Sequence, residues 1–181
     1  KIDCDGAVLQ ETPYFVNAAG FTIHSAVHMN REDAHYVMHL HTDQGAAVAA
    51  QKEGLLPLTQ HALIVLPRLS YHDYEGIALN LDERERLVND LGPTSTLMLL
   101  RNHGTLALGA SAADCWTGMF YLERACKMQV MALSAGRENV LLSPAPARAE
   151  VKGQTAQGVG GGLAWPGALR KLERESPGYD V

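Results

Sequence analysis

Apolar positions along the chain follow two periods, and each period predicts a different kind of element. Over residues 20–30 the apolar side chains recur every three to four positions, which predicts a short helix. Over residues 35–42 they recur at every second position, which predicts a strand. We expect the apolar face of this strand to pack against the core. The opposite face, which carries His39 and His41, is expected to line a cleft.

Elements of both kinds continue to about residue 136. Continuous apolar runs at 62–66 and 96–100 predict buried strands, and residues 105–109 predict a short return strand. Residues 71–79 are expected to be a loop that enters a strand. Three further helices are expected from their caps and apolar spacing: 44–53 after Asp43, 82–91 after Asp82 with Glu85, and the longest, 112–135, after Ser111 with Asp114.

Length and composition fit one domain, residues 1–181, because 46% of the 181 residues are apolar and supply a sizeable core. The alternation of helices and strands predicts an α/β layer architecture. A stretch rich in Pro, Gly and Ala at 142–162 predicts a loop, and residues 163–181 predict a C-terminal helix with an exposed tail. On the longest helix, Glu123 and Arg124 are expected to be solvated charges.

Charge and cysteine usage exclude several kinds of partner and compartment. The chain has 15 Lys and Arg against 20 Asp and Glu, a formal net charge of −5, so no basic face is expected and nucleic acid is excluded as a partner. No apolar run approaches the roughly 20 residues that span a bilayer, so no membrane insertion is expected. The three cysteines are an odd number without CxxC spacing, which favours a reducing, cytoplasmic compartment.

Three histidines are placed to share one ion. Side chains two positions apart on a strand point to the same face and lie roughly 7 Å apart, so His39 and His41 form a candidate ligand pair. His103 follows a predicted strand in the sequence Asn-His-Gly, whose glycine permits a turn that projects the imidazole. Three imidazoles with one position open to water or substrate form a catalytic zinc site.

The other histidines have simpler explanations. His24 and His28 lie four apart on a predicted helix, a spacing more typical of a surface or core face than of a metal site. The run from His39 to Asp43 is similar to the HxHxD start of the metallo-β-lactamase motif and would indicate a hydrolase, but Gln44 stands where that motif has its next histidine. The remaining histidines are expected to be solvated: His35, His61 and His72.

Five segments follow one another along the chain: AGFTIHSAVH, VMHLHTDQGAAVAA, KEGLLPL, YHDYEGI and LLRNHGTLALG. With these segments, over about residues 15–136, the chain resembles the class II aldolase/adducin family. The resemblance implies a central, mostly antiparallel sheet flanked by helices, and a homotetramer with sites near subunit boundaries. It implies that His39, His41 and His103 bind a divalent metal, usually zinc. It also implies an N-terminal portion that this sequence lacks.

The resemblance is incomplete where the family's sugar-phosphate aldolases carry their acid and their phosphate ligands. Their catalytic carboxylate stands four residues before the position of His24, where this chain has Gly20. Their two phosphate-binding hydroxyl residues match Ala18 and Ala19. We therefore expect an unphosphorylated substrate and a different proton carrier. The candidates are Tyr71 and Asp73, followed by Tyr74 and Glu75.

Two functions follow from the resemblance. The first is a metal-binding lyase that acts on a small unphosphorylated hydroxy-carbonyl or sugar-derived compound. The alternative is a non-catalytic, adducin-like oligomeric interaction module of the cytoskeletal type with a remnant metal site. The segments AGFTIHSAVH and YHDYEGI are closer to the adducin head branch, whereas all three ligand-type histidines of the aldolases are kept.

Overall fold

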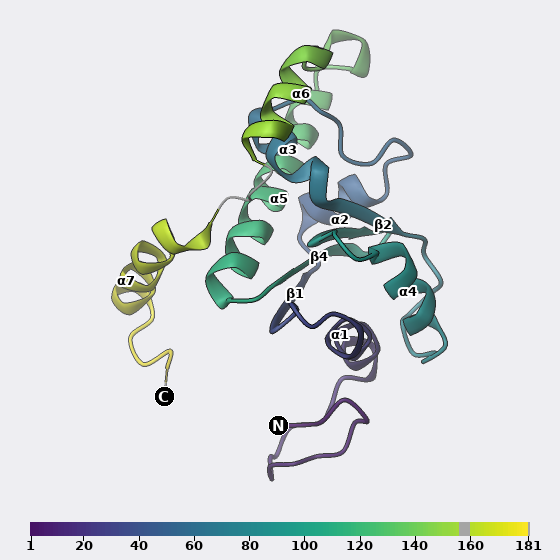
Figure 1. Ribbon diagram of the computed structural model, residues 1–181, viewed down its shortest axis with the longest axis vertical. Coiled ribbons are helices and arrows are strands. Elements are labelled where there is room, and N and C mark those ends of the chain that lie inside the picture. Colours follow the sequence, from purple (N-terminus) through teal and green to yellow (C-terminus); the bar gives the residue numbers. More distant parts are fainter. Residues whose placement is uncertain (156–159, 181) are drawn as a thin grey trace.

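A four-stranded mixed sheet forms the centre of the computed structural model, which describes residues 1–155 and 160–180. Its strands are β1 (Tyr36–Leu40), β2 (Leu69–His72), β3 (Leu97–Leu100) and β4 (Gly104–Gly109), in the spatial order β1-β4-β3-β2 (Figure 1). β4 pairs with both β1 and β3 in antiparallel fashion, whereas β2 runs parallel to β3. The predicted α/β fold with a mostly antiparallel sheet is confirmed.

Helices cover both faces of this sheet. α1 (Ala18–Asn30) and α4 (Glu83–Leu91) lie on one face. α2 (Asp43–Ala49), α3 (Gln60–Val65) and α5 (Ala112–Leu133) lie on the other. No helix within the described ranges is long and apolar enough to cross a bilayer.

The two faces of the sheet carry separate cores, and β3 contributes to both. Leu97 and Leu99 pack with α2, α3 and α5, whereas Met98 and Leu100 pack with α1 and α4. All four side chains are at most 2% exposed. A strand buried on both faces has a continuous apolar sequence, which explains why the run at 96–100 is a reliable strand signal.

β1 is partly covered on both faces, which corrects the expectation that one face of residues 35–42 packs against the core and the other lines a cleft. Met38 and Leu40 pack towards α5 as predicted, but Tyr36, on the same face, is half exposed. On the opposite face Val37 packs against the core beneath α1. The histidine face of β1 is thus partly a packed surface, and His39 lies half-buried near its end.

The caps of α2 and α5 show why these helices begin where they do. Thr42 caps α2, because its Oγ1 accepts the Gly45 N–H at 2.9 Å, and Asp43 is the first helical residue rather than the predicted cap. Ser111 caps α5 as predicted, with its Oγ accepting the Asp114 N–H at 3.1 Å.

The predicted strand at 62–66 is wrong, because these residues belong to α3 and to the 3-10 turn η1 (Leu66–Arg68). Thr59 starts the helix, since its Oγ1 accepts the Ala62 N–H at 3.2 Å. A short apolar run fits a buried helix as well as a buried strand, and here the cap at Thr59 favours the helix.

Two details around α4 also differ from the prediction. At 71–79 the strand comes first, since β2 ends at His72 and the loop follows it. Asp82 precedes α4 without a side-chain hydrogen bond to the helix, so the predicted capping box with Glu85 is wrong. α4 itself forms as expected and ends at Gly92, whose φ of 65° favours glycine.

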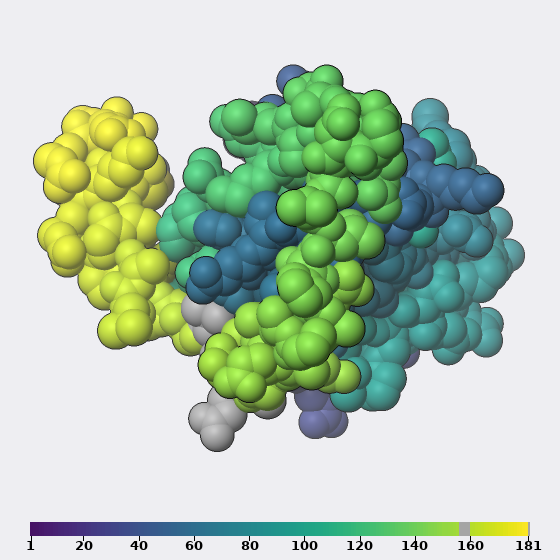
Figure 2. Space-filling model, turned by 90° about the horizontal axis from the view of Figure 1, so that it is seen from above, coloured from purple at the N-terminus to yellow at the C-terminus, as the bar shows by residue number. Residues whose placement is uncertain are grey.

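The C-terminal part is more helical than its composition indicates. The predicted loop at 142–162 contains α6 (Ala145–Gln154) and the start of the 3-10 turn η3 (Gly161–Leu163), while its residues 156–159 lie outside the described part. α6 carries a proline in its first turn, where the missing N–H costs nothing. α7 (Trp165–Glu175) forms as predicted and lies to one side of the molecule (Figure 2). A further 3-10 turn, η2 (Arg137–Asn139), follows α5.

Candidate metal centre

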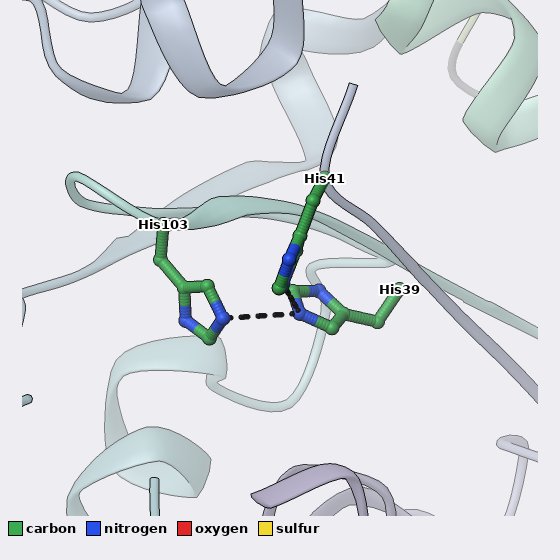
Figure 3. A group of neighbouring side chains, drawn as sticks. All are labelled: His39, His41 and His103. Atoms are coloured by element: carbon green, nitrogen blue, oxygen red, sulfur yellow. Dashed lines mark hydrogen bonds between the residues drawn. The ribbon is translucent and has the colours of Figure 1, made fainter. Parts of the chain in front are cut away.

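The three predicted histidines meet at one edge of the sheet, where β1 ends and where β3 turns into β4. His39 lies in β1, His41 follows the end of that strand, and His103 lies in the turn between β3 and β4. Within the turn, Asn102 takes the left-handed conformation with a φ of 54°, which asparagine tolerates better than most residues. One ring nitrogen from each histidine lies within 4.8 Å of the others, and the three imidazoles point towards one another (Figure 3).

The hydrogen bonds of His39 set its tautomer. Its Nδ1 lies 2.8 Å from the carbonyl oxygen of Thr105, which can only accept, so Nδ1 carries the proton. In the neutral ring the Nε2 lone pair is therefore free and faces the other two imidazoles. This Nε2 lies 2.8 Å from Nε2 of His41 and 3.3 Å from Nε2 of His103.

These distances suit a small divalent cation. Two nitrogens bound to a tetrahedral zinc with Zn–N bonds of about 2.0–2.1 Å lie roughly 3.3 Å apart. The His39–His103 separation of 3.3 Å matches this value, and the 2.8 Å separation of His39 and His41 is slightly shorter. Lone pairs that face one another so closely repel unless a proton or a cation lies between them. The three side chains could therefore hold a small divalent cation between them.

Burial keeps the imidazoles of His39 and His103 in the form that binds metal. The pKa of His39 is lowered to about 4, chiefly by burial and also by the neighbouring His103, His41 and His24, against the opposing effect of the Thr105 hydrogen bond. The pKa of His103 is also lowered, first by burial and then by His41. Both rings are thus neutral at pH 7, and a metal does not have to displace a proton from them.

Gly104 allows the strands to approach closely beside these rings. A Cβ at this position would overlap the carbonyl oxygen of Leu40 and would lie 3.1 Å from Cδ2 of His41 and 3.3 Å from Cε1 of His39. The glycine of the Asn-His-Gly turn is therefore a steric requirement of the site.

The proposed proton carriers lie elsewhere on the same edge of the sheet. The Tyr71 hydroxyl accepts the Leu55 N–H at 3.1 Å, its ring lies 4.3 Å beneath the Arg101 guanidinium, and burial raises the pKa of Tyr71. Asp73 is exposed and borders a surface hollow beside Arg101 and Asn102. In the described structure neither side chain forms a hydrogen bond with the three histidines.

Other titratable residues of interest occupy different surroundings. His24 is half-buried on α1 with its ring centroid 6.4 Å from that of His28, and burial followed by His28 lowers its pKa. His72, expected to be solvated, is instead buried against α4. Glu123, expected to be a solvated charge, is half-buried and accepts hydrogen bonds from Thr42 and Thr105. No periodicity signals such pairings, because the partners are far apart in sequence.

Comparison with known proteins identifies the family of the chain. Residues 1–130 match the family described as the Class II Aldolase and Adducin N-terminal domain. The chain belongs to this family. A Caulobacter vibrioides protein, provisionally named an aldolase class 2 protein, is 71% identical over 181 residues, covering 99% of this chain and 70% of that protein.

Two further relatives show how wide the class II aldolase/adducin family is. A crystal structure of an aldolase II superfamily protein from Pseudomonas syringae superposes with a TM-score of 0.92 at 44% identity, covering 98% of this chain and 72% of that one. Alpha-adducin of Rattus norvegicus is 39% identical over 168 residues, which is 90% of this chain but 23% of the adducin. The predicted family is confirmed, and its members include both aldolase-type and adducin-type proteins.

In this class II aldolase/adducin domain the start of α1 has no acidic side chain. Asn17 caps the helix, and its Oδ1 accepts the N–H groups of Ala19 at 3.1 Å and Gly20 at 3.4 Å. Next to Gly20, Ala18 and Ala19 supply no hydroxyl group. This helix start therefore offers neither a carboxylate for proton transfer nor hydroxyl ligands for a phosphate.

Proposed function

We propose that this chain binds a divalent metal ion, zinc, through Nε2 of His39, His41 and His103. We further propose that the site serves a lyase acting on a small unphosphorylated hydroxy-carbonyl or sugar-derived compound. The observation that carries the proposal is the convergence of three Nε2 atoms around His39, whose own tautomer is set by Thr105. Membership of the class II aldolase/adducin family supports it.

The chemistry divides between the ion and the chain. Bound zinc would supply Lewis-acid polarisation of a substrate carbonyl or hydroxyl oxygen. The chain holds Nε2 of His39 neutral and directed at the other two rings, and the absence of a hydroxyl at Ala18 and Ala19 disfavours a phosphorylated substrate. Asp73, exposed at the same edge of the sheet, is the favoured candidate for moving a proton, because burial raises the pKa of the Tyr71 hydroxyl.

Oligomeric state and location complete the proposal. We expect a homotetramer, as the resemblance to the family's aldolases implies. The three free cysteines favour a reducing, cytoplasmic compartment.

Elemental analysis and a substrate screen test the proposal. We expect about one zinc per chain in purified protein, loss of that zinc in the double variant His39→Ala/His103→Ala, and retention in the control His35→Ala, whose side chain is exposed. Small hydroxy-aldehydes, hydroxy-ketones and hydroxy acids are then incubated with metal-loaded and chelated protein. Metal-dependent carbon–carbon cleavage that Asp73→Asn slows supports the lyase. Protein that takes up no zinc with its histidines intact contradicts it.

A second candidate is an adducin-like interaction module with a remnant metal site. The identity to alpha-adducin over most of this chain, and Gly20 in place of the catalytic carboxylate, favour it. The two candidates differ in what removal of the histidines does. An interaction module keeps stoichiometric binding to its protein partner when all three histidines are replaced, whereas a lyase loses its turnover.

A further inference from the structure

Glu123 of α5 connects two residues that flank the candidate metal ligands. Its Oε2 accepts the Thr42 hydroxyl at 2.5 Å, and its Oε1 accepts the Thr105 hydroxyl at 2.5 Å. These bonds span 81 and 18 residues of sequence, so they are tertiary links rather than local helix contacts. Both carboxylate oxygens of Glu123 are thus used.

Each threonine is coupled directly to a ligand residue. Thr42 follows His41, at the point where β1 has ended and the sheet ladder no longer holds the backbone. Thr105 lies in β4, is fully buried, and its carbonyl oxygen receives the Nδ1 proton of His39. Glu123 therefore ties the segment that carries His41 to the residue that orients His39.

The Glu123 carboxylate fits against the start of α2 because Gly45 has no side chain. A Cβ added to Gly45 would lie 2.9 Å from Oε1 of Glu123, 2.8 Å from Oγ1 of Thr42 and 2.8 Å from Cγ2 of Thr105. Gly45 is the residue whose N–H bonds to Thr42, so the start of α2, the threonine and the carboxylate form one packed unit. Such packing restricts Glu123 to the geometry described.

The charge of Glu123 has no basic partner within ion-pair distance in the described part of the chain. A half-buried carboxylate without a cationic neighbour is costly unless hydrogen bonds or a nearby cation compensate it. Two hydroxyl donors, Thr42 and Thr105, supply that compensation. Thr105 is itself the hydrogen-bond partner of the ligand residue His39, so the carboxylate holds in place an outer group that orients a ligand.

We propose that Glu123 is a positioning residue of the metal centre, which sets the separation of His39 and His41 through Thr105 and Thr42. The inference rests on the proposed function, because it requires that the three histidines bind a metal. It assigns to α5, which supplies no ligand, a part in metal affinity and coordination geometry.

The test compares zinc affinity and cobalt spectra of the full chain and its variants. Glu123→Gln keeps the shape of the side chain but removes its charge and one acceptor. We expect its zinc affinity, measured by competition with a chromophoric chelator, to fall about 10- to 100-fold. We expect its Co²⁺ adduct to show shifted visible bands, since these report coordination geometry. The matched control Arg124→Gln, on the exposed neighbouring position, should keep wild-type values.

A second pair of variants separates positioning from folding. Thr42→Ser keeps a hydroxyl for Glu123 and for the cap of α2, whereas Thr42→Val removes it. We expect Thr42→Ser to bind zinc as the wild type does and Thr42→Val to bind it more weakly with an altered cobalt spectrum. This pair decides the matter if Glu123→Gln does not fold.

The outcomes distinguish failure of the role inferred for Glu123 from failure of the proposed metal site. A wild-type chain that binds no zinc overturns the proposed function and this inference with it. A wild-type chain that binds zinc, together with a Glu123→Gln variant of unchanged affinity and cobalt spectrum, overturns the inference alone. A lower melting temperature of Glu123→Gln with unchanged affinity and spectrum also overturns it, because that is the result of a merely structural role.

Discussion

Asp90 of α4 accepts a hydrogen bond from Nδ1 of His72 at 2.7 Å and thereby joins this helix to the end of β2. His72 is 3% exposed, and its second ring nitrogen lies 3.4 Å from Oε1 of Glu83, which is itself buried. The imidazole therefore hydrogen-bonds one carboxylate of α4 and lies beside a second, to which its Nε2 makes no hydrogen bond. It fixes α4 against the strand whose end borders the loop with Asp73.

Removal of this imidazole should destabilise the fold. We expect His72→Leu to lower the free energy of unfolding by about 2–4 kcal/mol, because the buried Glu83 carboxylate loses its neighbouring polar partner. Urea unfolding measures the change. In the double variant His72→Leu/Glu83→Gln part of the loss should be recovered, since the amide is less costly to bury than the charge. Strictly additive effects in this double-mutant cycle would show that the two side chains do not interact.

The parts of the fold that sequence analysis predicted correctly are those with local signals. The β3 strand, the Asn-His-Gly turn and the capped start of α5 are each specified by neighbouring residues, as are the paired positions of His39 and His41. The strand predicted in place of α3 is wrong because a short apolar run fits either element, and the Thr59 cap and the packing against α5 decide for the helix. The loop predicted in place of α6 is wrong because a composition rich in Pro, Gly and Ala hides a helix that carries a proline in its first turn. The sequence predicts solvated side chains for His72 and Glu123, which is wrong because their partners lie 11 to 81 residues away and leave no local signal.

Substitution of Gly104 should damage the metal centre directly. The Cβ of Gly104→Ala would overlap the Leu40 carbonyl oxygen and crowd His39 and His41. We expect a loss of about 1–3 kcal/mol in unfolding free energy and a weaker zinc affinity. Gly153→Ala is the matched control, because a Cβ there meets nothing within 4 Å and alanine favours the helix α6. Equal unfolding free energies and zinc affinities of the two variants would mean that β1 and β4 do not lie close together at Gly104.

The three thiols should differ sharply in reactivity. Burial raises the pKa of Cys115 to about 11 and that of Cys126 to about 12, whereas Cys4 is exposed. At pH 8 the two thiols of α5 are protonated and shielded, so an alkylating reagent should label native protein at Cys4 and reach the other two after unfolding in denaturant. Mass spectrometry of peptides reads out each site. Rapid labelling of Cys126 in native protein would contradict the packing of α5 against the sheet.

Zinc should raise the melting temperature of the protein by binding His39, His41 and His103, and not by binding the remaining histidines. A ligand at about 100 times its Kd that binds only the folded state adds about 2.7 kcal/mol. For a chain of this size each kcal/mol raises the melting temperature by about 2–4 °C, which corresponds to a rise of roughly 5–10 °C. His103→Asn removes one of the three nitrogens that converge on the site, so its melting temperature should respond far less to the same zinc concentration. The exposed His35→Asn serves as the control and should respond as the wild type does. An equal rise in wild type and His103→Asn would place the bound zinc elsewhere on the protein.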